Sequence, residues 1–506
     1  MALPASTFGR FPVILILSLA YLMATFFIQQ FGCRATQADG AAIERQLLSR
    51  GCTAVSEVSS ADFVVVNTCT VTAAADAQAR DAIRKIHSAN PSARVIVTGC
   101  YAQRAPEDLT ALPGVSWVVG NSHKPQIPQL IGALSLPQRS MLQQDFFPAA
   151  SLETEPLSLS HAPAKILTGS IFARSEFLAA PVLGGEGNHT RPTLKIQDGC
   201  NSRCSYCVIP FVRGKSRSLP PEAVLQEIRT LTASGFREIV LSGINLGTYG
   251  RDLSPRVEFS ALLRRILDET SLERLRISSI EPLDVTHDLI DLFASTDRIA
   301  QHFHMPLQSV SDRILAAMHR WYRAEHYARR VELIRERLPH AAIGADVIAG
   351  FPGETQADHS ATLAFIETLP FTYLHVFSYS ARPGTKAAAL PDQLPTAVIK
   401  RRARELRALG EVKSAAFRRS QIGCSLRVLT LRREESSAAP SHSTTPALSS
   451  NYLRVHVSGI WPANSWLNVR ILSEEGNYLV GEPEVSLRSH SASGLCETSA
   501  YSASLR

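Results

Sequence analysis

The stretch Gly199-Cys200-Asn201-Ser202-Arg203-Cys204-Ser205-Tyr206-Cys207 decides how the rest of the chain is interpreted. Its three cysteines have the spacing CxxxCxxC and follow a short apolar run, Thr193–Ile196, that predicts a strand. Thiolates are soft ligands that suit zinc, copper(I) or an iron–sulfur cluster. The stretch therefore predicts a metal site in a loop that directly follows a strand.

The number of ligands favours iron over zinc. A structural zinc site needs a fourth Cys or His, and residues 208–218, Val-Ile-Pro-Phe-Val-Arg-Gly-Lys-Ser-Arg-Ser, contain neither. Three thiolates on a four-iron cluster leave one iron open to bind a substrate or a cofactor. We therefore favour an iron–sulfur cluster, with a zinc site or plain buried thiols as the alternatives.

The composition indicates several packed domains in a reducing compartment. The chain has 506 residues, of which 45% are hydrophobic, and this is enough for two to four ordinary domain cores. Its nine cysteines lack the short-range pairing of a secreted disulfide scaffold. The composition thus excludes a disordered protein and predicts a cytoplasmic one.

The amino-terminal segment allows three interpretations. Phe11–Ile28 is uncharged, mostly apolar and long enough to span a bilayer. A signal peptide is disfavoured because only Arg10 supplies positive charge and no small-residue cleavage site follows. A membrane anchor conflicts with Thr25–Phe31, which predicts a strand. We therefore expect Met23 to be the true start, residues 1–22 to be a leader or a gene-model extension, and no stable membrane association.

Residues 23–130 predict an amino-terminal α/β domain with a parallel sheet. The pattern indicates helices at Gly40–Arg50 and Ala73–Ala89 and strands at Thr25–Phe31, Phe63–Asn67 and Arg94–Thr98. Each predicted strand runs into a cysteine, and these are Cys33, Cys69 and Cys100. Ligands of open α/β sheets bind beyond the carboxyl ends of the strands. The three thiols are therefore a second candidate cluster site, and three unrelated buried cysteines are the alternative.

The central part of the chain predicts a partial (β/α)6 barrel. Residues 131–190 lose periodicity and predict a linker. Residues 191–415 then alternate helices with strands, which we expect at Thr193–Gln197, Glu238–Ser242, Arg274–Ser278, Ala300–Met305, Ala342–Ile348 and Tyr373–Phe377. In such barrels the chemistry takes place at the carboxyl ends of the strands. The CxxxCxxC loop after the first strand has the position of a catalytic loop.

The carboxy-terminal part predicts a basic helix and a small β-barrel-like module. Lys400–Arg433 contains eleven Lys or Arg against two Glu, a local charge of +9 in a chain of net charge +7. Such a helix beside a small β-module is typical of a nucleic-acid-binding surface, although a solvated helix face is the simpler alternative. Within the module at 416–485, the low-complexity residues 434–450 predict a disordered insertion, and 486–506 predict a tail.

These motifs together resemble the radical S-adenosylmethionine (SAM) methylthiotransferases. The cysteine loop and its Ile-Pro-x-x-Arg-Gly-x-x-Arg-Ser continuation, Gly199–Ser218, resemble the radical SAM motif of that family. Its amino-terminal domain is matched by Phe31-Gly-Cys-Arg-Ala-Thr-Gln-Ala-Asp39, Asn67-Thr-Cys-Thr-Val-Thr72 and Val97-Thr-Gly-Cys-Tyr-Ala-Gln103, and its barrel by Gly350-Phe-Pro-Gly-Glu-Thr355. The module at about 420–483 resembles the family's TRAM domain.

The resemblance implies a transferase with two 4Fe-4S clusters. Cys200, Cys204 and Cys207 would hold the radical cluster, whose open iron binds SAM and cleaves it to a 5′-deoxyadenosyl radical. Cys33, Cys69 and Cys100 would hold an auxiliary cluster that carries the sulfur to be inserted. By position in the barrel, Ser242 and Gly243 would contact the methionyl group of SAM, and Glu281 would contact its ribose.

The resemblance also implies the substrate and the partners. The Phe-Gly-Cys-Arg-x-x-Gln-x-Asp signature at Phe31–Asp39 and the Thr-Gly-Cys-Tyr-Ala-Gln stretch at Thr98–Gln103 are most similar to the branch that acts on N6-threonylcarbamoyladenosine at tRNA position 37, whereas Arg34-Ala35-Thr36 differs from the residues typical of the other two branches. The alternatives within the family are N6-isopentenyladenosine in tRNA and an aspartate of a ribosomal protein. The implied partners are tRNA, a flavodoxin- or ferredoxin-like electron donor and a sulfur donor. Two hypotheses from other functional classes stay open. The chain is then either a non-catalytic, zinc-stabilised RNA-binding protein or a membrane-anchored iron–sulfur electron carrier.

Overall fold

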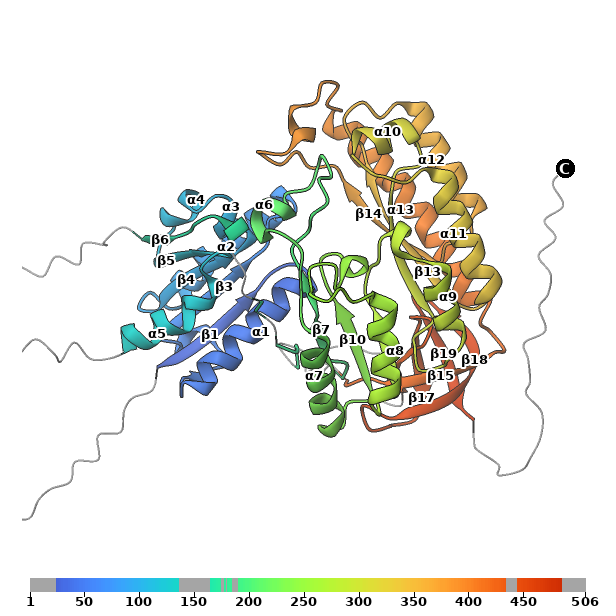
Figure 1. Ribbon diagram of the computed structural model, residues 1–506, viewed down its shortest axis with the longest axis horizontal. Coiled ribbons are helices and arrows are strands. Elements are labelled where there is room, and N and C mark those ends of the chain that lie inside the picture. The colour runs from blue at the N-terminus through green and yellow to red at the C-terminus, as the bar shows by residue number, and fades with distance from the viewer. Residues whose placement is uncertain are drawn as a thin grey trace, which may run out of the picture.

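The chain forms three parts, an amino-terminal α/β domain, a central half-barrel and a small β-barrel (Figure 1). The structure, a computed structural model, describes residues 24–135, 164–173, 177–178, 180–183, 190–433 and 444–484. The expected leader at 1–22 and the expected tail at 486–506 lie outside these residues. No helix in the described ranges has the length and apolar character needed to cross a bilayer.

The amino-terminal domain is built on a parallel six-stranded sheet. Its strand order is β2-β1-β3-β4-β5-β6, formed by β1 (Thr25–Gln30), β2 (Thr53–Ala54), β3 (Phe63–Thr68), β4 (Arg94–Gly99), β5 (Val115–Gly120) and β6 (Lys165–Leu167). Val64 and Val66 pack with helix α2 (Ala73–Ala89), whereas Val65 packs on the opposite face with helix α1 (Arg34–Ser49). The β-branched runs are thus buried on both faces, as a parallel sheet requires.

Two predictions for this domain need correction. The expected linker at 131–190 contains β6, which pairs with β5 in the register Trp117↔Lys165 and extends the sheet. Helix α1 begins at Arg34 rather than Gly40, because the carbonyl of Cys33 already accepts from the backbone N–H groups of Thr36 and Gln37. The helix therefore starts immediately after the first cysteine.

The central part is the predicted partial (β/α)6 barrel. Its parallel strands are β7 (Thr193–Lys195), β10 (Glu238–Ser242), β11 (Arg274–Ile277), β12 (His302–Gln308), β13 (Ala342–Ala349) and β14 (Tyr373–Ser378). Isolated bridges, Leu275↔Ile299 and Ser279↔His304, join the two three-stranded sheets into one curved sheet. The outer layer consists of α7 (Pro221–Ala233), α8 (Phe259–Glu269), α9 (His287–Ala294), α11 (Ala324–Arg337), α12 (Gln356–Thr368) and α13 (Thr396–Arg419).

Short elements at the carboxyl ends of these strands surround the cysteine loop. They are the hairpin of β8 (Gln197–Asp198) and β9 (Arg217–Ser218), helix α6 (Ile209–Arg213) and helix α10 (Asp312–Ala317). The corresponding end of the amino-terminal sheet carries helix α3 (Cys100–Arg104), which lies beside α6 (Figure 1). The two cysteine-bearing edges therefore face each other.

The carboxy-terminal module is a closed barrel of strand order β15-β16-β17-β19-β18. The strands are β15 (Ser425–Thr430), β16 (Thr444–Ser449), β17 (Arg454–Ser458), β18 (Trp466–Glu475) and β19 (Tyr478–Pro483). The small β-barrel is thus confirmed. The predicted insertion at 434–450 is wrong from Thr444 onward, because those residues form β16 and bury Ala447 in the barrel core. Residues 434–443 lie outside the described ranges.

A buried ionic cluster attaches this small barrel to the central part. The carboxylate of Glu238, at the start of β10, accepts from the Nε atoms of Arg274 (2.6 Å) and Arg276 (2.7 Å). The two guanidinium groups then donate to backbone carbonyls of the small barrel, including Leu448 (3.1 Å) and Ser449 (2.9 Å). The small barrel is therefore fixed at the amino ends of the central strands, away from the cysteine loop.

Candidate active site

Backbone contacts hold the CxxxCxxC loop at the carboxyl ends of the central strands. The amide of Cys200 donates to the carbonyl of Gly214 (3.0 Å), and that of Ser205 donates to the carbonyl of Met318 (3.0 Å) at the end of α10. Gly199 has a φ of +71°, and a Cβ at this position would lie only 2.0 Å from a backbone oxygen of the segment before β9. A glycine is required here because the two segments approach so closely.

The three thiols of this loop share one site. Burial raises the pKa of Cys207 to about 12, and the neighbouring thiols of Cys204 and Cys200 add to the rise. The amide of Ser202 donates to the Sγ of Cys200 (3.4 Å), and Nη1 of Arg320 donates to the Sγ of Cys204 (3.5 Å). Such donors stabilise thiolates, and a bound cation displaces their protons.

A cavity of about 610 Å³ opens beside all three cysteines of the loop. Its rim includes Phe172, Phe211, Arg203, Lys215 and Lys386. This volume lies within the range of small-molecule sites, and the cationic side chains suit an anionic occupant. The donor set, the burial and the available room fit a three-thiolate cluster with a small cofactor beside it.

Cys33, Cys69 and Cys100 come together at the carboxyl edge of the amino-terminal sheet. They follow β1, β3 and β4, which are neighbours in the sheet. A Cβ at Gly32, where φ is +93°, would lie 2.5 Å from the Cβ of Cys69. Burial raises the pKa of Cys69 to about 11, and the thiols of Cys100 and Cys33 add to the rise. The donor set again fits a cluster, and the role of these residues as ligands stays a prediction.

Direct contacts join the two cysteine edges. Cys100 packs with Val208 and Val212, which belong to the segment just after the CxxxCxxC loop. The Nδ2 of Asn121, which follows β5, donates both to the Sγ of Cys100 (3.6 Å) and to the carbonyl of Val212 (2.8 Å). A shift of one cysteine edge would therefore disturb the other.

A second cavity, of about 190 Å³, lies between the two cysteine loops. Val71 and Thr72, just after Cys69, form one part of its wall, and residues 206–209, which include Cys207, form another. Asp346 on β13 also lines it. Cys207 of one triplet therefore lines a cavity whose wall also includes the segment just after Cys69 of the other triplet.

A buried network of charges connects the domains beneath these loops, and it was not predicted from the sequence. The carboxylate of Asp39 on α1 accepts from Lys124 (2.9 Å), from Arg213 (3.1 Å) and from Lys195. Lys195 and Arg213 also bind Asp198, at 3.1 and 2.9 Å. All five side chains are at most 3% exposed.

This network carries more positive than negative charge beside the amino-terminal triplet, because Lys124, Lys195 and Arg213 face Asp39 and Asp198, and Arg217 lies 3.7 Å from Asp198 as well. Burial raises the pKa of Cys100, whereas Arg213 and Lys124 act to lower it. Excess positive charge in a buried site stabilises thiolates and an anionic iron–sulfur cluster. Asp39 closes the Phe31–Asp39 motif, but Lys124 lies in no motif, and its polar neighbours, Asn121-Ser-His123 and Pro125-Gln126, give no sequence signal that it is buried.

The predicted SAM contacts lie at the carboxyl ends of β10 and β11. Ser242 is the buried last residue of β10, and a Cβ at Gly243 would lie 3.0 Å from Gln197. Glu281, which follows β11, forms an ion pair with Arg320 (Nη1 to Oε1, 3.2 Å). Burial raises the pKa of Glu281, and Arg320 opposes that rise. Sequence reasoning missed Arg320, which links Glu281 to the thiol of Cys204.

Many cations of the basic stretch at 400–433 are engaged within the protein. Arg402 is buried against Glu354 (2.7 Å), and both Arg418 and Arg419 bind Glu474 of the small barrel. Helix α13 itself packs over β13 and β14. Many of these positive charges are therefore paired with groups of the protein itself. The local charge of +9 is for this reason a weaker indication of an RNA-binding surface than its size implies.

The comparisons with known proteins agree with this geometry. Residues 25–120 match the uncharacterized protein family UPF0004, and residues 194–366 match the radical SAM superfamily. The chain is 37% identical over 404 residues to the threonylcarbamoyladenosine tRNA methylthiotransferase of Aquifex aeolicus (strain VF5), a match that covers 80% of this chain and 92% of that protein. The same-named protein of Bacillus subtilis (strain 168) is 36% identical over 77% of this chain and 81% of its own length.

A relative with another printed substrate is almost as similar. The tRNA-2-methylthio-N(6)-dimethylallyladenosine synthase of Syntrophobacter fumaroxidans (strain DSM 10017 / MPOB) is 35% identical over 76% of this chain and 79% of its own length. The names of all three relatives describe methylthio transfer to tRNA or its product. The chain therefore belongs to the radical SAM methylthiotransferase family.

Proposed function

We propose that this enzyme adds a methylthio group to carbon 2 of N6-threonylcarbamoyladenosine at position 37 of tRNA. Enzymes of its family transfer a methylthio group, use SAM and carry two 4Fe-4S clusters. The observation that carries the proposal is that one cavity is lined both by Cys207 with its neighbours and by Val71 and Thr72, which follow Cys69. Replacing an unactivated aromatic C–H bond requires a radical source and a sulfur source beside the same carbon atom, and cofactors supply both.

The proposal assigns one cluster to each triplet. Cys200, Cys204 and Cys207 would hold the cluster that acts with SAM, and Cys33, Cys69 and Cys100 would hold the auxiliary cluster. The protein side chains would fix the two groups on either side of the target base and exclude water from the space between them. The buried cations beside Cys100 and the guanidinium of Arg320 beside Cys204 would balance the negative charge of the clusters.

Ser242, Gly243 and Glu281 would contact SAM at the carboxyl ends of β10 and β11. Glu281 is positioned for this role by Arg320, which also reaches a cysteine of the loop. An acceptor such as Glu281 would bind a ribose hydroxyl, and the guanidinium beside it would attract a carboxylate.

The choice of nucleoside has support from the motif after the first cysteine. The signature Phe31–Asp39 resembles the threonylcarbamoyladenosine branch, and the relatives at 37% and 36% identity have that substrate in their names. Thr36 faces the site, because its hydroxyl lies 3.6 Å from the Sγ of Cys33 and accepts from Arg213 (3.2 Å). N6-isopentenyladenosine is the competing substrate.

Nucleoside mass spectrometry tests this proposal. The purified enzyme, reconstituted anaerobically with iron and sulfide, is given SAM, a reductant and tRNA that carries either modified adenosine. We expect 2-methylthio product on the threonylcarbamoyl substrate. Product only on the isopentenyl substrate would reject the choice of nucleoside, and absence of 5′-deoxyadenosine would reject the radical reaction itself. The proposal also requires a flavodoxin- or ferredoxin-like electron donor, a sulfur donor and a cytoplasmic location.

A further inference from the structure

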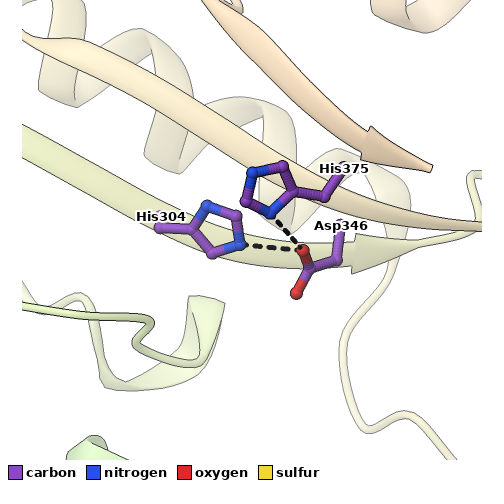
Figure 2. A group of neighbouring side chains, drawn as sticks. All are labelled: His304, Asp346 and His375. Atoms are coloured by element: carbon purple, nitrogen blue, oxygen red, sulfur yellow. Dashed lines mark hydrogen bonds and ion pairs between the residues drawn. The ribbon is translucent and has the colours of Figure 1, made fainter. Parts of the chain in front are cut away.

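The inner face of the half-barrel carries a ladder of polar side chains. On β12, β13 and β14 the residues of one face pack with the outer helices, as Met305, Ala345 and Val347 do. The opposite, inner face carries instead His302, His304, Gly344, Asp346, Tyr373 and His375. Three of these, His304, Asp346 and His375, are drawn in Figure 2. An alternation of this kind separates the core face from a functional face.

Hydrogen bonds give this ladder a direction. A carboxylate only accepts, so a neutral His304 donates from Nε2 to Oδ1 of Asp346 (2.9 Å), and in this tautomer its Nδ1 is an acceptor. The hydroxyl of Tyr373 then donates to that Nδ1 (2.8 Å) and accepts from Nε2 of His302 (2.7 Å). His375 supplies a second ring nitrogen, Nδ1, 3.4 Å from the same Oδ1 of Asp346. The ladder therefore ends on one carboxylate oxygen.

The ladder is held rigidly by its neighbours. A Cβ at Gly344 would lie 2.0 Å from the ring of Tyr373, so only glycine lets that ring cross β13 to reach both imidazoles. Tyr452 of the small barrel stacks on His302, with ring centroids 4.4 Å apart. The position of the Asp346 side chain therefore depends on a series of contacts that starts at Tyr452 of the small barrel and runs through His302, Tyr373 and His304.

One oxygen of Asp346 is left for a ligand. Both dashed lines in Figure 2 meet at one oxygen, and the other oxygen points away from the two rings. Within the described part of the chain, no residue forms a hydrogen bond with that second oxygen, Oδ2. Asp346 lines the cavity between the cysteine loops and is 20% exposed. Oδ2 of Asp346 is therefore a carboxylate oxygen without a protein donor in the described ranges, in a cavity beside Cys207. A ligand that binds in this cavity can supply the missing hydrogen-bond donor.

The cavity has the character of a site for one flat ring. Its volume of about 190 Å³ is smaller than that of typical drug-sized ligand sites. Tyr206, Phe377 and Tyr379 line it, together with residues next to Cys69 and Cys207. Bases of single-stranded RNA loops are recognised by stacking on aromatic rings and by hydrogen bonds to their edges.

We propose that Asp346 is a specificity-determining residue that accepts a hydrogen bond from the N6–H of the target adenine. An adenine with one substituent on N6 has a single N–H on its base, and its ring nitrogens are acceptors that a carboxylate repels. The carboxylate therefore selects the N6 edge, rejects a base with a carbonyl oxygen at position 6, and orients the ring. This inference rests on the proposed function, because it requires an N6-substituted adenosine as the substrate.

A metal ion is the competing occupant of this cluster. The ligand atoms of His304, Asp346 and His375 lie within 4.8 Å of one another. A metal on Nε2 of His304 would reverse the ladder and place a proton on Nδ1 of His302. That atom is buried and has no partner among the described residues, so the reversal would leave an unpaired donor. The cost of this unpaired donor favours a hydrogen-bonding carboxylate over a metal ligand.

Two RNA probes that differ only in the N6–H test the inference. They are anticodon stem-loops with N6-threonylcarbamoyladenosine or N6-methyl-N6-threonylcarbamoyladenosine at the target position, and their Kd values are measured on the reconstituted holoenzyme. We expect wild type to bind the N6–H probe about tenfold to hundredfold more tightly, the range for a hydrogen bond to a charged group. In Asp346→Asn and Asp346→Ala we expect this ratio to fall below about threefold. Asp291→Asn, an exposed carboxylate on α9, is the matched control and should keep the wild-type ratio.

Tyr373→Phe separates positioning from direct contact. It removes the hydroxyl that joins His302 to His304 but leaves the carboxylate in place, so we expect a ratio between those of wild type and Asp346→Ala. Unchanged iron content and absorbance verify that each variant is assembled. An unchanged ratio in Tyr373→Phe would contradict the ladder's part in positioning Asp346.

Three results would overturn the inference. The first is equal wild-type affinity for the two probes, which decides the question even if the variants fail to fold. The second is a wild-type ratio in Asp346→Ala. The third is a stoichiometric divalent ion other than iron that survives chelation in wild type and is lost in Asp346→Asn. Failure of the proposed function is a separate result, namely the absence of methylthio product on the threonylcarbamoyl probe.

Discussion

The two thiol triplets reach similar surroundings by opposite routes. Cys200, Cys204 and Cys207 lie on one short loop, so local backbone contacts gather them. Cys33, Cys69 and Cys100 are brought together only because β1, β3 and β4 are adjacent in a parallel sheet. A triplet on a loop depends on local geometry, whereas a triplet collected from three strands depends on the whole domain. The two triplets should therefore differ in their function and in what their stability depends on.

The largest expected effect is the loss of all activity in Cys204→Ala. This thiol belongs to the triplet assigned to SAM cleavage, so we expect no 5′-deoxyadenosine, no methylthio product and about half of the wild-type iron after reconstitution. Liquid chromatography and iron analysis measure these quantities. Normal SAM cleavage in this variant would contradict the assignment of SAM cleavage to the triplet Cys200, Cys204 and Cys207.

Cys69→Ala should separate the two half-reactions. The remaining triplet keeps its cluster, so we expect SAM to be cleaved to 5′-deoxyadenosine while methylthio product falls below detection. The same two assays distinguish this variant from Cys204→Ala. Loss of SAM cleavage here would mean that the triplets do not act as separate units.

Lys195→Met tests the buried network that links the triplets. Its removal leaves Asp39 and Asp198 short of one buried cation, and breaking a buried ion pair costs about 3–5 kcal/mol. Denaturant unfolding of the apoprotein measures the change, and Lys400→Met, an exposed cation on α13, is the control. A loss no larger than in the control would show that the network is not needed for stability.

The network also predicts acid sensitivity of the apoprotein. Burial acts to raise the pKa of Asp39, but Lys124, Lys195 and Arg213 together hold it well below its usual range. A carboxyl group whose pKa is lowered by folding stabilises the folded state at every pH above its unfolded pKa of about 4. This stabilisation is lost progressively as the pH falls below that value. Unfolding free energies measured from pH 6 down to pH 3 should therefore decline less steeply in Lys195→Met than in wild type.

Metal binding to each thiol triplet should depend on pH. Burial raises the pKa of Cys207 to about 12 and that of Cys69 to about 11. Bound metal displaces these protons, so the Co(II) affinity of each apoprotein triplet should rise as the pH is raised from 6 to 9. Cobalt–thiolate absorbance in Cys69→Ala and Cys204→Ala isolates each triplet. A Co(II) affinity that does not change with pH would show that the thiols do not release protons when the metal binds.

The smallest expected effect is that of Glu281→Gln. The substitution retains a carbonyl acceptor but removes the charge that pairs with Arg320, so SAM affinity should fall by only a few-fold, about 1 kcal/mol. Equilibrium binding measures it, with the exposed Glu325→Gln as control. Unchanged affinity would argue against Glu281 as a SAM contact.

The sequence predicted those features that depend on neighbouring residues. The CxxxCxxC spacing is local, and the short apolar runs before Cys33, Cys69 and Cys100 indicated strand ends correctly. Strand β6 was missed because its three residues, 165–167, carry no periodic signal, and only pairing with β5 makes them a strand.

The polar residues that complete the site could not be assigned from the sequence. Asp39 meets Lys195 across 156 positions, and Arg320 meets Glu281 across 39. The strand alternation that places His304, Asp346 and His375 on one face can be read only when the register of three strands is known. Such contacts are fixed by tertiary packing, which leaves no signal in the local sequence.

The attachment of the small barrel has a consequence for how the protein can change. Arg274 and Arg276 bind backbone carbonyls of Leu448, Ser449 and Ser450, not their side chains. Because every residue type supplies a carbonyl, substitutions at 448–450 can accumulate while these bonds persist, whereas Tyr452 and Trp466 contribute to the anchorage through their rings. The residues at this edge can thereby vary in sequence without altering the angle at which the module is mounted.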